Sequence, residues 1–273
     1  MANDEIELSV EDGLATLTLT RPDAGNAINR SFVSLLRAHA ESLHHRADVR
    51  VVVLRSTGRN FCVGGDLRYF SGLADIEPEI LSLATDFHAG IYALRELDAP
   101  VLAGVQGAAA GGGLALACAC DLVLAAESAS FTMAYTGAGL SPDGGSSWFL
   151  PRIVGWRIAT ELILTNRVLS AAEAQAAGLV TSVVSDDALG EELDATAARL
   201  GAGATRAFGS VKRLLRASAT ASLQEQLAAE GREVAANAAA RDGREGVSAF
   251  LARRTPVFDG TCLDPLPDVG DPP

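Results

Sequence analysis

The stretch "PVLAGVQGAAAGGGLALACACDLVLAAESASF" (residues 100–131) alternates short apolar runs with glycines, and this pattern decides the fold class. Pro100 precedes "VLAGV", an apolar run typical of strands that are buried on both faces. The glycines 111–113 open an apolar helix, and "DLVLAA" (121–126) indicates a further strand. Glycines and an aspartate interrupt the apolar residues, so the stretch predicts strand, turn and buried helix instead of a membrane span.

Strand and helix patterns continue on both sides of this stretch. Residues 6–19 alternate apolar and polar side chains around a turn at 11–13, which predicts a hairpin. "VVVL" (51–54) and "LVTSVV" (179–184) indicate further strands, and an amphipathic helix is predicted between the hairpin and the first of them. Because strands and helices alternate, we predict an α/β fold.

The pattern changes near residue 190, where Ala-rich helical segments replace the strands. We therefore predict a core over 1–190, a helical C-terminal region over 191–258, and a disordered tail over 259–273 that is rich in Pro and Asp. Residues 68–90 are expected to be poorly ordered.

Composition excludes several functions. The formal net charge of −12 argues against a nucleic-acid surface, which needs clustered Lys and Arg. The four cysteines (Cys62, Cys118, Cys120 and Cys262) have no C-x-x-C spacing, so we expect no metal site and reduced, packed thiols. The acidic start "MANDEIELSV" has no apolar signal region, and we predict a soluble cytoplasmic protein with no membrane contact.

Two glycine turns follow two of the predicted buried strands. The first reads "VGGDL" and contains Gly64 and Gly65, and the second contains Gly111 and Gly112. In parallel sheets the carboxyl ends of strands are where ligands bind, and glycines let backbone N–H groups approach a ligand. Two such turns can aim two amides at one oxygen, as in an oxyanion hole. For either turn alone, tight turning and close packing are the favoured explanation.

Asp143 lies in "GLSPDGGSSW" (139–148), between Pro142 and two glycines. Pro-Asp-Gly is ordinary turn chemistry, so the local string alone favours a turn residue. Motifs for dinucleotide binding, phosphate loops, serine-elbow hydrolysis and zinc proteolysis are missing from the sequence.

Taken in order, six stretches resemble the crotonase family, the enoyl-CoA hydratases and isomerases. They are "RPDAGNAIN" (21–29), "FCVGGDL" (61–67), residues 100–131, "GLSPDGGSSWFLPRIVG" (139–155), "LSAAEAQAAGLVTSVV" (169–184) and "DGREGVSAFLARRTPVF" (242–258). The resemblance implies a spiral of ββα units, a C-terminal helical region for homotrimers or dimers of trimers, and an acyl-CoA substrate with no other cofactor. It assigns the two oxyanion amides to Gly65 and Gly112.

The departures from the family bear on the reaction. The hydratase branch has two catalytic glutamates, and this chain has Ala115 and Tyr135 at the matching positions. Water addition needs an acid–base pair, so ordinary hydratase activity is not expected. A similar Pro-Asp string carries a basic aspartate in isomerases that resemble the ring-epoxide isomerase of phenylacetate breakdown. In the 4-chlorobenzoyl-CoA dehalogenases the aspartate is a nucleophile, assisted by a histidine that matches His88.

With this resemblance, Asp143 is predicted to be catalytic, with isomerase preferred because one carboxylate suffices for an allylic proton shift. A dehalogenase, or an inert CoA-thioester binding protein, remains the alternative. His88 is a possible assistant, although its helical context favours a half-buried structural histidine. Substrate contacts are predicted at Cys62, Gly64, Arg68, Gly111, Tyr135 and Trp148. Arg21 and Arg68 are candidates for binding the CoA phosphates. Asp66 is predicted to cap a helix, and Asp121 is predicted to have a structural role.

Overall fold

The structure is a computed structural model, and it describes residues 5–259. Its main sheet has six strands in the order β1-β2-β3-β4-β6-β9, with β1 and β2 antiparallel and the other neighbours parallel. The strands are β1 (Ile6–Glu11), β2 (Leu14–Leu19), β3 (Val51–Ser56), β4 (Val101–Val105), β6 (Leu122–Ala126) and β9 (Ser182–Val184). The predicted strands are therefore present, although β9 begins only at Ser182.

A smaller sheet lies beside the main one and contains β5 (Ala108–Ala110), β7 (Ser130–Thr132) and β8 (Leu169–Ser170). β4 and β5 are followed by α4 (Gly112–Ala119), and β6 and β7 lead to α5 (Ser146–Val154). Each of these units gives one strand to each sheet and then a helix. This repetition is the expected spiral of ββα units.

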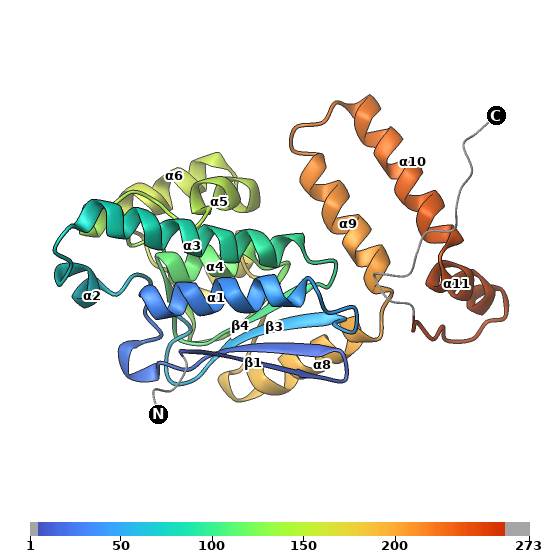
Figure 1. Ribbon diagram of the computed structural model, residues 1–273, viewed down its shortest axis with the longest axis horizontal. Coiled ribbons are helices and arrows are strands. Elements are labelled where there is room, and N and C mark those ends of the chain that lie inside the picture. The colour runs from blue at the N-terminus through green and yellow to red at the C-terminus, as the bar shows by residue number, and fades with distance from the viewer. Residues whose placement is uncertain (1–4, 260–273) are drawn as a thin grey trace.

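Helices cover both faces of the main sheet. α1 (Arg30–Leu43) and α3 (Ile76–Glu96) pack side by side over one face, whereas α8 (Leu189–Gly201) lies on the other (Figure 1). α8 buries Leu189, Leu193 and Ala197 against β3, β4 and β6. The remaining core helices are α2 (Leu67–Ser71), α6 (Trp156–Thr165) and α7 (Ala171–Ala176).

The prediction of poor order over 68–90 is wrong. These residues form α2 and most of α3, and α3 buries Leu83, Phe87, Ile91 and Leu94. Apolar residues four, four and three positions apart lie on one helical face, so packing on α1 holds this segment.

The C-terminal region is helical, as predicted, but its first helix, α8, packs with the core. The helices that follow are α9 (Thr205–Ala217), α10 (Leu223–Ala239) and α11 (Arg241–Leu251), and they extend away from the sheets (Figure 1). They expose apolar side chains at Val211, Leu215, Leu223, Leu227, Val234, Val247, Phe250 and Leu251. The predicted tail lies outside the described residues apart from Asp259, as does Cys262.

Within residues 5–259, no helix is both long and apolar enough to span a bilayer, and no group of His, Cys, Asp and Glu is arranged to hold a metal ion.

One carboxylate joins α9 to α10. Glu233 accepts hydrogen bonds from Ser210 Oγ at 2.6 Å and from Arg213 Nη2 at 3.1 Å, and the Arg213 contact lowers the pKa of Glu233. Glu233 therefore binds a proton less well in the folded protein than in the unfolded chain. Its contribution to the free energy of unfolding is present above pH 4.5 and is lost as pH falls through the lowered pKa.

We expect Glu233→Gln to lower the unfolding free energy by about 1 kcal/mol at pH 7, and by progressively less below pH 4.5. Urea denaturation at several pH values measures the difference from wild type. Glu230→Gln, on the exposed side of the same helix, is the matched control and should match wild type throughout. A Glu233→Gln difference that does not change with pH would contradict this account.

Candidate active site

The two glycine turns lie against each other. After β3, the Cys62 N–H donates to Ala108 O at 3.1 Å, and the Ala110 N–H donates to Cys62 O at 2.9 Å. This short parallel bridge places the first turn beside the end of β5, from which the second turn leaves. The second turn therefore follows β5, and not β4 directly as the sequence suggested.

Only glycine fits where the turns touch. Gly64 has a φ of +92°, and a Cβ on it would lie 2.8 Å from Ala110 O and 3.4 Å from Gly112 N. Gly111, with a φ of +51°, faces Gly64 Cα across the same contact. A side chain at Gly64 would separate the turns.

Two backbone donors are left without partners at this contact. The Ile28 N–H donates to Gly64 O at 2.8 Å and the Asp66 N–H donates to Ile28 O at 2.9 Å, so the Gly65 N–H points away from Ile28. Gly112 is the first residue of α4, where an N–H has no intrahelical acceptor. Across residues 5–259, neither N–H has a hydrogen-bond partner within the protein. The arrangement has the parts of an oxyanion hole.

Asp143 makes its turn with the backbone alone, so its carboxylate takes no part in the turn. Its carbonyl oxygen accepts from Ser146 N at 3.1 Å and from Ser146 Oγ at 2.7 Å. Gly144 and Gly145 follow with φ values of +61° and +75°. The turn interpretation is thus correct for the backbone, while the side chain remains available for chemistry.

The carboxylate of Asp143 contacts His88, on α3. His88 Nε2 lies 2.5 Å from Asp143 Oδ1, and the Gly144 N–H points at the same nitrogen from 3.3 Å. A ring nitrogen cannot donate and accept at once, and the shorter contact with a carboxylate favours a proton on Nε2. The His88 side chain is 51% exposed. His88 thus contacts the Asp143 carboxylate and is not packed in the core, and its role as an assistant stays a prediction.

The Asp143 turn packs on α4 where hydratases have a glutamate. A Cβ on Gly144 would lie 2.8 Å from Ala115 Cβ and 2.7 Å from Phe87 Cε1. Ala115 is fully buried. The glutamate position on α4 is thus closed by the turn that carries Asp143.

Tyr135 connects the glycine turns with Asp143. Its ring carbon Cζ lies 3.9 Å from the position that a Cβ on Gly111 would take. Burial, and secondarily the negative charge of Asp143, raise the pKa of Tyr135, so the phenol is neutral at pH 7. Its hydroxyl oxygen is buried and has no partner with hydrogen-bond geometry among the described residues. The hydroxyl is therefore enclosed by the protein, next to the backbone of Asp143.

Cys62 supports the turn from behind. Its side chain is fully buried, and this burial raises the pKa of the thiol to about 12. The residue thus stays a neutral thiol and takes part through its backbone. Cys118 and Cys120 are also buried and reduced, as the sequence predicts.

Other predicted residues lie farther from Asp143. Asp66 caps α2 by accepting from the N–H groups of Arg68 and Tyr69, as predicted, and pairs with Arg21 at 2.8 Å. Arg68 is exposed on α2, which begins two residues after Gly65. Asp121 pairs with Lys212 at 2.7 Å and with Arg95 at 3.3 Å, which fits a structural role.

A cavity of about 660 Å³ opens at the carboxylate of Asp143. Trp148 lines it, as its predicted role requires, together with His88, Tyr92, Arg95 and Phe149. Sequence reasoning missed Tyr92 and Arg95. Tyr92 and Arg95 lie on the helical face that contains His88, four and seven positions further on, which was the available signal.

Comparison with known proteins agrees with this geometry. A sequence model described as Enoyl-CoA hydratase/isomerase matches residues 9–261. A Rhodobacter capsulatus protein named "Probable enoyl-CoA hydratase" is 39% identical over 265 residues, which cover 95% of this chain and all of that protein (100%). The 1,2-epoxyphenylacetyl-CoA isomerase of Escherichia coli is 36% identical over 92% of this chain and 97% of its own length.

A solved structure gives the same result. The enoyl-CoA hydratase from Polaromonas sp. JS666 superposes with a TM-score of 0.88 at 35% identity, covering 93% of this chain and 99% of that one. The sequence match, the fold and the paired glycine turns lead to one conclusion: the chain belongs to the enoyl-CoA hydratase/isomerase family and has the crotonase fold.

Proposed function

We propose that this protein is an enoyl-CoA isomerase that moves a double bond along an acyl-CoA. The observation that carries the proposal is a single carboxylate, Asp143, paired with His88 in a site that also offers the unpaired N–H groups of Gly65 and Gly112. His88 Nε2 contacts Oδ1 of this carboxylate, and we assign the role of the base to Oδ2.

The proton shift needs only these parts. Asp143 takes a proton from C2 of a 3-enoyl thioester, and the electron pair moves onto the thioester oxygen, which accepts from Gly65 and Gly112. The carboxyl group then returns the proton to C4, and the double bond forms between C2 and C3. Oriented amides stabilise the charge of the dienolate as it develops.

Hydration is disfavoured because the position of one family glutamate is filled. Ala115 is buried beneath Gly144, and Tyr135 stands at the other position with a phenol that stays neutral. Neither residue is a base for activating water at pH 7.

Two observations favour hydrolytic dehalogenation of an aromatic acyl-CoA as the second candidate. His88 touches Asp143, and Tyr92, Trp148 and Phe149 line the adjoining cavity despite the low aromatic content of the chain. In that reaction Asp143 attacks the ring carbon that bears the halogen and halide leaves. Water then hydrolyses the aryl ester while His88 takes its proton.

Product analysis distinguishes these reactions. The protein is incubated separately with a 3-enoyl-CoA, a 2-enoyl-CoA and a 4-halobenzoyl-CoA. We expect a double-bond shift without mass change from the first and no reaction from the others. Water addition or halide release as the main reaction would contradict the proposal, and binding without any reaction would indicate an inert CoA-thioester binding protein.

Tyr135 provides a test of whether a buried phenol takes part in the reaction. We expect Tyr135→Phe to keep kcat within about threefold of wild type, because the hydroxyl is buried and Tyr135 does not line the cavity at Asp143. Steady-state kinetics on the isomerase substrate measures this. Tyr69→Phe, on α2, where only the backbone N–H of Tyr69 bonds Asp66, is the control and should also retain wild-type kinetics. A tenfold or larger loss of kcat in Tyr135→Phe would contradict this and show that its hydroxyl meets the substrate.

We also propose that copies of the chain associate as homotrimers or as dimers of trimers in the cytoplasm. Support comes from the apolar side chains that α9, α10 and α11 expose, since such surfaces commonly mark protein interfaces.

A further inference from the structure

The turn that carries Asp143 ends at a buried hydroxyl. Ser146 is the first residue of α5, and its side chain is fully buried. Across the described residues 5–259, the only hydrogen bond that its Oγ makes is to Asp143 O, at 2.7 Å. A hydroxyl is costly to bury unless it is bonded, so this bond accounts for a polar side chain at a buried position. The hydroxyl therefore acts on the residue that supplies the carboxylate.

Ser146 donates twice to the same oxygen. Its N–H reaches Asp143 O from 3.1 Å, and its Oγ reaches it from 2.7 Å. Two donors on one carbonyl oxygen restrict the rotation of the peptide group between Asp143 and Gly144 more than a single donor does. The Cα of Asp143 lies in the plane of that peptide group. The two bonds therefore also fix the direction in which the Asp143 side chain leaves the backbone.

Core side chains hold the next residue, Gly144. A Cβ on Gly144 would lie 2.7 Å from Phe87 Cε1 and 2.8 Å from Ala115 Cβ. Both side chains are buried, Phe87 on α3 and Ala115 on α4. The backbone at Gly144 thus lies so close to the core that even a methyl group would clash, and it cannot shift towards either helix.

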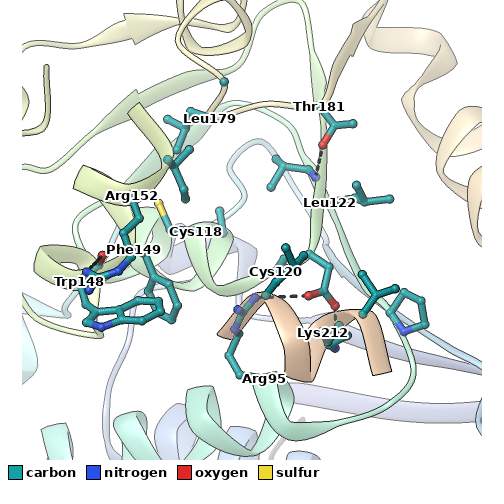
Figure 2. A pocket seen from close by; sticks show the side chains of 18 of the residues that line it. Arg95, Cys118, Cys120, Leu122, Trp148, Phe149, Arg152, Leu179, Thr181 and Lys212 are labelled. Carbon is teal, nitrogen blue, oxygen red and sulfur yellow. Dashed lines mark hydrogen bonds and ion pairs between the residues drawn. The ribbon is translucent and has the colours of Figure 1, made fainter. Parts of the chain in front are cut away.

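An aromatic ring holds the residue after that, Gly145. A Cβ on Gly145 would lie 2.7 Å from Phe149 Cε2. The centre of the Phe149 ring lies 5.5 Å from the guanidinium carbon of Arg95 and 5.0 Å from the centre of the Trp148 ring. Figure 2 shows Trp148, Phe149 and Arg152 grouped at one side of a second cavity, of about 580 Å³, and Arg95 at another. These contacts keep the ring against Gly145.

The carboxylate of Asp143 is held at its other end. His88 Nε2 contacts Oδ1 at 2.5 Å, while Ser146 holds the backbone of the same residue. The movement of the side chain is therefore limited from both ends. Among these contacts, the Ser146 hydroxyl can be removed without a clash and without an unpaired carbonyl, because the Ser146 N–H still donates to Asp143 O.

One carboxyl group must serve two carbons in the proposed reaction. It takes a proton from C2 and must deliver it to C4, two bonds further along the acyl chain. A dienolate without positional control accepts a proton more readily at C2, beside the carbonyl group, and this only forms the substrate again. Product formation therefore depends on holding the carboxyl group where it can reach C4.

We propose that Ser146 is a positioning residue, which sets where the Asp143 carboxyl group stands relative to C2 and C4 of the substrate. The hydroxyl is buried and acts through the carbonyl oxygen of Asp143. This inference rests on the proposed isomerase function. Loss of the hydroxyl changes the fate of the dienolate, and not only the rate at which the dienolate forms.

The fate of the dienolate is measured in D₂O. Wild type and Ser146→Ala are incubated with a 3-enoyl-CoA, and NMR gives the amount of 2-enoyl product and the deuterium at C2 of the recovered substrate. We expect Ser146→Ala to lower kcat about tenfold, and to lower the ratio of product to C2 exchange at least threefold. KM should stay within about threefold, because the donors of Gly65 and Gly112 are untouched. Product and exchange both scale with the amount of active enzyme, so partial unfolding does not change their ratio.

Two further variants serve as comparisons. Ser42→Ala, on α1, removes an exposed hydroxyl that also donates at 2.7 Å to the carbonyl three residues before it, and it should leave kcat and the ratio unchanged. Ser146→Cys has a similar size and a weaker donor, so its ratio should fall between those of wild type and Ser146→Ala. A loss of kcat in Ser146→Ala with an unchanged ratio would overturn the positioning role and leave the isomerase standing.

A second readout does not need turnover. The imidazole NMR signals of His88 in the ligand-free protein, identified by their loss in His88→Gln, report the contact with Asp143 Oδ1. Ser146→Ala should shift these signals, and Ser42→Ala should not. If no 3-enoyl-CoA reacts, the isomerase proposal fails and these signals decide. Shifted signals keep Ser146 as the residue that positions Asp143, and unshifted signals overturn both proposals.

Discussion

Asp143→Asn is expected to lower isomerase kcat by about 100- to 10,000-fold, the range for loss of a general base. Asparagine keeps the size of the side chain and the backbone bonds to Ser146, so the turn on Gly144 and Gly145 is preserved. Its amide has no basic oxygen for the proton at C2. Steady-state assays of double-bond migration measure the loss.

Binding should survive this change. The donors of Gly65 and Gly112 are untouched, so we expect the Kd for a non-reacting acyl-CoA to stay within about threefold. Asp75→Asn, an exposed position before α3 with no side-chain cap, is the matched control and should keep full activity. Activity of Asp143→Asn within tenfold of wild type would remove Asp143 from the role of base.

Gly64→Ala should have the second largest effect, a fall in kcat of about 100-fold or more. At a φ of +92° the added Cβ meets Ala110 O at 2.8 Å, which is rigid backbone and cannot turn aside. Separating the turns moves the Gly65 N–H away from the Gly112 N–H, and the dienolate loses one of its two donors. Kinetics together with a thermal unfolding curve separate this loss from unfolding.

Gly139→Ala controls for backbone strain. Gly139 has a φ of +72° but open space around its would-be Cβ, so the variant pays the conformational cost without a clash. We expect it to lose some stability and to keep kcat. Equal losses of kcat in the two variants would mean that contact between the turns is not what holds the oxyanion donors.

Much of the fold is visible in the sequence because its signals are local. The apolar runs at 51–54 and 101–105 are buried strands, and the glycines at 64–65 and 111–112 mark the turns after them or just beyond. The family resemblance drawn from these motifs is confirmed by the family match over 9–261.

Contacts between distant residues were harder to predict. His88 and Asp143 are 55 positions apart, and a lone histidine in a helical stretch gives no sign of what it faces. The packing of α8 on the sheet was missed for a similar reason. Composition changes near residue 190, but burial of Leu193 and Ala197 depends on strands far away in the chain.

The segment 68–90 has the apolar spacing of a helix, but other apolar residues in the segment obscure this spacing. Leu83, Phe87, Ile91 and Leu94 have helical spacing, while Ile76 and Leu81 in the same helix are exposed. Exposed apolar residues make an amphipathic pattern harder to recognise in a sequence. The contact with α1 determines which face of the helix is buried.

The most direct test of the central claim is NMR of a 3-enoyl-CoA incubated with the wild-type protein in D₂O. The account predicts a 2-enoyl product, with exchange at C2 and C4 that Asp143→Asn abolishes. If the thioester binds but neither exchanges a proton nor moves its double bond, Asp143 is not a base for this class of substrate.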